Sequence, residues 1–66
     1  MEFKDVLKDL RISHNLSQMQ LSKETGLSQS AIAKWELGKT EPTATAIVVL
    51  SKFFEETADY LLGLSE

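Results

Sequence analysis

Residues that begin or end helices recur at short intervals along this chain. Serine and threonine side chains accept hydrogen bonds from the free amides of a helix's first turn, and the candidates are Ser17, Ser28, Thr43 and Thr57. Glycine and asparagine adopt the left-handed backbone conformation that ends helices, and the candidates are Asn15, Gly26, Gly38 and Gly63. This arrangement restricts the chain to several short helices.

Apolar residues between these signals recur at helical spacing, as Phe3, Leu7 and Leu10 show in the first segment. Ser17 and Gln20 have the spacing of a capping box, in which each side chain bonds the other residue's backbone amide. We expect helices over residues 2–14, 17–24, 28–36, 43–54 and 57–62. No segment alternates in polarity as a strand would, and no internal repeat occurs. The sequence therefore predicts one all-α domain of five helices over residues 1–66.

The composition is that of a folded domain and supplies few groups for catalysis or metal binding. Of the 66 residues, 42% are hydrophobic, 26% are charged and none is cysteine. Neither a disulfide nor a zinc site with thiolate ligands can form. His14 is the only histidine, and we interpret it as a packing or surface residue. We therefore predict that the protein is not an enzyme and needs no metal, no cofactor and no small-molecule ligand.

The apolar segments are too short to cross a membrane. The longest covers residues 46–50, whereas a spanning helix needs roughly 20 apolar residues. The first five residues lack the basic head and apolar stretch of a signal peptide. We expect a cytoplasmic protein with no membrane partner.

The net charge of −3 is unevenly distributed along the chain. Residues 11–40 contain four cations and two anions, a net charge of +2. Residues 41–66 contain Lys52 and five acidic side chains, a net charge of −4. A net negative charge argues mildly against nucleic-acid binding. The basic middle segment, however, is suited to binding an anion. Scatter in a small sample is the alternative explanation.

Residues 17–36 form the most informative part of the chain, because two short helices there are joined by a turn that contains glycine. In the second helix, Ile32 and Trp35 are spaced to point into the core. The opposite face carries small and polar side chains, namely Gln29, Ser30, Ala33 and Lys34. Such a face fits the major groove of DNA, about 12 Å wide, and a glutamine amide matches the adenine edge. A solvated face of an ordinary helical bundle is the alternative.

The stretch from Leu16 to Lys39 closely resembles the helix-turn-helix of the Cro and phage-repressor family, also called the XRE family. The resemblance continues in Leu10-Arg11, in Glu41-Pro42-Thr43 and in residues 59–63. It implies a lambda-repressor-like five-helix domain that binds operator DNA as a dimer and regulates transcription.

The resemblance also implies roles for particular residues. The positions that read bases in this family are occupied by Gln29, Ser30 and Lys34, with Ala33 able to touch a thymine methyl. The positions that contact the DNA backbone are occupied by Ser17, Gln18, Lys39, Thr40 and Thr43, and the position of Gln18 also braces the third helix, which is the recognition helix of this family. Ser22 and Leu37 depart from the family pattern, which commonly has alanine at the first position and a polar residue at the second.

Arg11 and Glu36 resemble a paired position that links the first helix to the end of the third. A glutamate near a helix C-terminus is unfavourable for the helix dipole, so a salt bridge to Arg11 would explain it. We expect this pair to set the angle of the recognition helix. The alternative is an exposed pair that contributes roughly 0–1 kcal/mol.

Apolar side chains near the C-terminus exceed what one core direction can hold. We interpret Val49, Phe53, Tyr60 and Leu64 as a dimer patch, with ordinary surface hydrophobes as the alternative. The sequence thus predicts a sequence-specific double-stranded DNA-binding protein, a transcriptional repressor that acts as a homodimer on a palindromic operator. The alternative function is a protein-interaction or antitoxin-type domain that keeps the fold and binds a protein partner.

Overall fold

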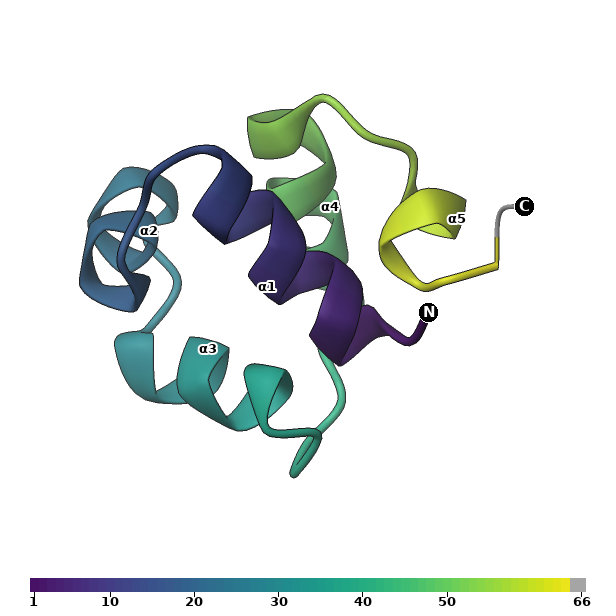
Figure 1. Ribbon diagram of the computed structural model, residues 1–66, viewed down its shortest axis with the longest axis horizontal. Helices are drawn as coiled ribbons and strands as arrows, with labels where there is room; N and C mark the ends of the chain where they lie inside the picture. Colours follow the sequence, from purple (N-terminus) through teal and green to yellow (C-terminus); the bar gives the residue numbers. More distant parts are fainter. Residues whose placement is uncertain (65–66) are drawn as a thin grey trace.

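Five α-helices and no strands are present over residues 1–64, the part of the chain that the computed structural model describes (Figure 1). The helices are α1 Phe3–Ser13, α2 Gln18–Thr25, α3 Gln29–Glu36, α4 Ala44–Phe54 and α5 Ala58–Leu61. The predicted all-α fold is confirmed, and every predicted helix is present within one or two residues of its expected ends.

The predicted helix starts are formed by side-chain caps. The Ser17 hydroxyl accepts from the Gln20 amide at 3.0 Å, and the Gln20 side chain accepts from the Ser17 amide at 2.8 Å. Ser28, Thr43 and Thr57 each accept in the same way from the amide three residues on. The short helices are therefore held at their N-termini by contacts that the local sequence encodes.

The core lies inside the molecule and takes buried side chains from all five helices, with one each from α2 and α5. Its buried residues are Val6, Leu7, Leu10, Leu21, Ile32, Trp35, Ala46, Ile47, Leu50, Phe54 and Leu61. Trp35 is buried with its ring edge-on to Phe3, so the predicted core role of this aromatic is confirmed. His14 is exposed and packs edge-on against Phe54, with its Nδ1 atom 2.8 Å from the Leu10 carbonyl oxygen.

Two residues other than glycine have a left-handed backbone. Asn15, predicted to end the first helix, has φ = 57°. Glu55, which the sequence did not mark, ends α4 with φ = 56°. The chain reverses here because the Ser51 hydroxyl and carbonyl bond the backbone of Glu56. Glu55 is unfavourable here for two reasons, since its β-carbon disfavours the left-handed conformation and an acidic residue stands at the negative end of the helix dipole.

We predict that Glu55→Gly raises the free energy of unfolding by about 0.5–1 kcal/mol, because glycine relieves the left-handed strain. The melting temperature should rise by about 4 °C in a thermal scan. Glu56→Gly is the matched control, since Glu56 has an ordinary backbone conformation and should lose stability. Equal effects of the two substitutions would contradict the strain at Glu55.

Candidate nucleic-acid interface

The turn between α2 and α3 is held by side chains of α2. Gly26 ends α2 with φ = 80°, and a β-carbon there would meet no atom within 4 Å, so the backbone angle alone requires glycine. The Ser22 hydroxyl donates to the Leu27 carbonyl at 2.6 Å, and the Thr25 hydroxyl donates to the Leu21 carbonyl at 2.7 Å. Ser22 stands where the family commonly has alanine. Its hydroxyl stabilises the turn through this bond to Leu27, which an alanine could not form.

α3 presents two chemically distinct faces. Ile32 and Trp35 are buried against the core, whereas the opposite face is available to solvent. On this second face Gln29, Ser30 and Lys34 are exposed, and Ala33 is half-buried. The helix lies along one edge of the molecule, clear of α4 and α5 (Figure 1). The structure thus brings the four candidate base-reading residues to one outward surface.

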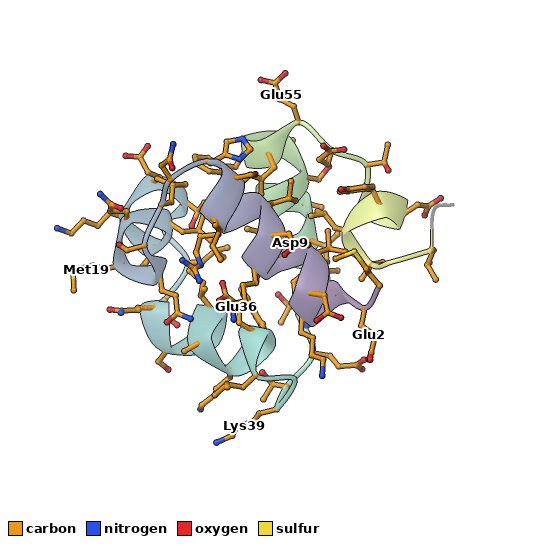
Figure 2. All side chains as sticks on the ribbon, viewed as in Figure 1. Glu2, Asp9, Met19, Glu36, Lys39 and Glu55 are labelled. Atoms are coloured by element: carbon orange, nitrogen blue, oxygen red, sulfur yellow. The ribbon has the colours of Figure 1, made fainter. Side chains whose placement is uncertain are left out.

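The candidate backbone-contacting residues lie in two places. Ser17 and Gln18 are at the N-terminus of α2, and Lys39, Thr40 and Thr43 follow α3. Lys39 and Thr40 are exposed, and Figure 2 shows Lys39 extending away from the body of the molecule. The hydroxyls of Ser17 and Thr43 accept cap bonds, and each keeps a hydrogen to donate.

Lys34 and Lys39 lie at the same end of α3. The Lys39 amide donates to the Lys34 carbonyl at 2.9 Å, which folds the loop back onto the last turn of the helix. Leu37, between them, is 66% exposed and offers no hydrogen bond. The positive charge at this end of α3 therefore comes from Lys34 and Lys39, which lie on either side of the apolar Leu37 in the sequence.

Arg11 and Glu36 form a two-pronged ion pair between α1 and α3. The Arg11 Nε atom donates to Glu36 Oε2 at 2.7 Å, and Nη2 donates to Oε1 at 2.9 Å. The third nitrogen of the guanidinium donates to the Leu16 carbonyl at 2.8 Å. The Gln18 side-chain amide also donates to Glu36 Oε1, at 3.1 Å. Glu36 is directed from α3 into the molecule (Figure 2).

This ion pair is nearly buried, so the small contribution to stability that is typical of exposed ion pairs does not apply to it. The side chains are only 13% exposed for Arg11 and 5% exposed for Glu36. The hydrogen bond that Arg11 donates to Glu36, together with the negative charge of that carboxylate, raises the pKa of Arg11 above its ordinary value, against the opposing effect of burial. Removal of one partner would leave the other as an uncompensated buried charge. The network thus ties the end of α3 to α1 and to the start of α2.

Sequence reasoning missed part of this network. The bond from Arg11 to the Leu16 carbonyl was not anticipated. The resemblance implied that Gln18 braces the recognition helix, and Gln18, the first residue of α2, donates to Glu36 at the end of α3. Gln18 is half-buried and already donates one amide hydrogen within the protein, so it could reach a phosphate only with the other hydrogen of its side-chain amide.

The four residues of the predicted dimer patch are not equally available. Tyr60 and Leu64 are 42% and 69% exposed, whereas Val49 and Phe53 are half-buried. Phe53 packs edge-on against Phe54, with ring centroids 5.0 Å apart, so part of its surface is used within its own chain. The exposed apolar surface of this region lies toward α5.

Neither a metal-binding cluster nor a membrane-spanning helix is present over residues 1–64. No group of three or more histidine, cysteine, aspartate or glutamate side chains there could hold a metal ion. None of the helices described has the length and hydropathy that crossing a membrane requires.

Comparison with known proteins identifies the class of this chain. A family model described as Helix-turn-helix matches residues 7–61, where the turn between α2 and α3 presents α3 at the surface. The chain belongs to this family and is of the Cro and phage-repressor type that its sequence resembles.

Particular relatives support this assignment. The HTH-type transcriptional activator BcrR of Enterococcus faecalis is 44% identical over 66 residues, which are all of this chain and 32% of BcrR. Repressor protein C2 of Salmonella phage P22 is 40% identical over 47 residues, which are 71% of this chain and 22% of C2. The crystal structure of the P22 c2 repressor protein in complex with a synthetic operator matches with a TM-score of 0.89 and 31% identity, covering 98% of each chain. The chain spans less than a third of the length of BcrR and of C2.

We predict that Glu36→Ala lowers the free energy of unfolding by about 3 kcal/mol, because it leaves the Arg11 guanidinium buried without its partner. The loss should appear in a thermal scan as a fall of at least 10 °C, at about 4–8 °C per kcal/mol. Glu41→Ala is the control, since Glu41 is exposed and close in sequence. An unchanged melting temperature for Glu36→Ala would show that the ion pair does not hold α3.

Proposed function

We propose that this chain binds double-stranded DNA sequence-specifically, with α3 in the major groove, and thereby regulates transcription. The observation that carries this proposal is the outward face of α3, where Gln29, Ser30 and Lys34 are exposed while the buried face is fixed to the core. Side chains of these types form the hydrogen bonds that distinguish bases, and a helix held at a defined angle can present them in register.

Contacts to the DNA backbone would hold the protein in place. Lys39 and Thr40 lie beyond one end of α3, and Ser17 and Gln18 lie at the start of α2. Phosphate contacts set the register on the duplex, and base contacts add the sequence preference. The small number of cations in this set supports a modest salt dependence, because each neutralised phosphate adds about 0.9 to the log–log slope.

We also propose that the chain acts as a repressor, in a homodimer on a palindromic operator. The P22 protein is named a repressor, and its structure was determined with a synthetic operator, whereas BcrR is named an activator. A two-fold axis would place two copies of α3 in successive major grooves, about 34–36 Å apart. A repressor of this kind needs only to occupy its operator.

Selection of bound sequences from a random pool of DNA duplexes tests this function directly. The proposal expects one enriched motif with two inverted halves, spaced by about one helical turn. Failure to enrich any motif, with a protein partner recovered in its place, would favour the protein-interaction function instead. Enrichment of a single half-site would support DNA recognition by one copy of the chain and would contradict the dimer.

We predict that Gln29→Ala lowers affinity by about 1–3 kcal/mol for the selected site and relaxes the preference at one base pair. Lys39→Ala should weaken binding to all sequences alike, because it removes a contact to the backbone. Competition gel shifts with single-base variants of the site measure both effects. Identical sequence preferences in the two variants would contradict the assigned roles.

The dimer would use the exposed apolar surface at α5 and the N-terminus. Met1, Tyr60, Leu62 and Leu64 are all exposed there, and Met1 lies against Gly63. Burial of such side chains between two copies stabilises association. Val49 and Phe53 would contribute only the surface that their own chain leaves uncovered.

We predict that Tyr60→Lys shifts the protein from dimer to monomer, because it places a charge in the apolar contact. Sedimentation equilibrium over a range of concentrations measures this change. Ile12→Lys is the matched control, since Ile12 is exposed on α1 and should leave the dimer intact. A wild-type protein that stays monomeric at high concentration would exclude a dimer formed by this chain alone.

A further inference from the structure

The first turn of α1 reaches the loop that follows α3. Gly38, the first left-handed residue after α3, has φ = 74°. A β-carbon built on it would lie 3.1 Å from the Lys4 Cδ atom and 3.7 Å from Lys4 Nζ. The aliphatic part of Lys4 therefore lies directly over Gly38, and its ammonium group lies beside the loop, although the two residues are far apart in the sequence.

The Lys4 ammonium group is not used in an ion pair within the described part of the chain. Over residues 1–64 the structure contains one salt bridge, between Arg11 and Glu36. Glu2 and Glu41 line the same hollow of about 320 Å³ as Lys4, and neither forms a salt bridge with it. The positive charge is thus held near the loop by packing and not by a carboxylate.

Lys4 adds a third cation to the end of α3. Lys34 is in the last turn of this helix, and the Lys39 amide is bonded to the Lys34 carbonyl. Gly38 precedes Lys39 directly, so the ammonium of Lys4 lies next to the segment that carries Lys39. Three lysines from two separate parts of the sequence therefore lie about one loop, and two of them already belong to the proposed DNA-binding surface.

We propose that Lys4 is a further DNA-backbone contact, which supplies a phosphate-facing cation from α1 to the loop after α3. This inference rests on the proposed DNA binding. The packing over Gly38 restricts the lysine stem before DNA arrives, so less conformational entropy is lost on contact than for a free surface lysine. The requirement for glycine at position 38 then has a second reason, since a side chain there would displace Lys4.

A purely structural role for Lys4 makes a different prediction. A cation near the C-terminal end of a helix stabilises that helix, and the lysine stem covers apolar surface. Those effects change the free energy of unfolding but not the number of counterions that DNA releases on binding. The salt dependence of DNA affinity therefore separates a phosphate contact from a packing contact.

The test compares Lys4→Met with wild type in fluorescence-anisotropy titrations at several salt concentrations between about 50 and 200 mM. The probe is a mixed-sequence DNA duplex of about three helical turns, so it requires no knowledge of the operator. Methionine keeps an unbranched stem over Gly38 and removes the charge. Lys4→Arg keeps the charge, and Lys52→Met removes a charge from the last turn of α4, at the opposite end of that helix from the loop (Figure 1).

Lys4→Met should weaken binding and reduce the log–log salt slope by about 0.9, while Lys4→Arg and Lys52→Met keep the wild-type slope. A wild-type slope for Lys4→Met, with or without a change in melting temperature, would overturn the inference and leave the proposed function intact. An equal loss of slope in Lys52→Met would also overturn it, since the effect would then reflect net charge alone. Wild-type protein that binds neither this duplex at any salt concentration nor any motif from the random pool would overturn the proposed function, and this inference with it.

Discussion

The ion pair between Arg11 and Glu36 is the interaction on which the geometry of the candidate interface depends. Its bonds join α1 to Leu16, two residues before α2, and to the last residue of α3, while Gln18 adds the first residue of α2. These are the elements that determine how α3 is presented. Because the two charges are nearly buried, the pair is favourable only when all its partners are in place. Such a network favours one arrangement of the helices over near alternatives.

The domain is small, and it has no disulfide to constrain it. A chain of this length buries only about 60% of the surface that its unfolded form exposes, so local contacts carry much of the stability. Side-chain caps at Ser17, Ser28, Thr43 and Thr57 supply such contacts at four helix starts. The caps define where each helix begins, and the core and the ion pair define how the helices pack.

The sequence predicted what depends on neighbours in the chain and missed what depends on distant partners. Helix starts and glycine ends follow from residue type within a few positions, so they were found nearly to the residue. The left-handed Glu55 was missed because glutamate does not signal that conformation. The packing of Lys4 on Gly38 was missed because the fold alone brings these two residues together. Phe53 is half-buried because it packs against the core and edge-on against Phe54.

The charge of the chain bears on how it would discriminate among DNA sequences. The net charge of −3 combines a basic middle segment, which contains α3, with an acidic C-terminal one. Few cations mean weak attraction to any phosphate backbone, because non-specific affinity is almost entirely electrostatic. Weak non-specific binding raises the ratio of specific to non-specific affinity, provided that base contacts are well positioned. The buried ion pair and the small number of cations are thus complementary in the proposed function. The ion pair fixes the candidate base-reading face, and the weak phosphate attraction would leave selectivity to that face.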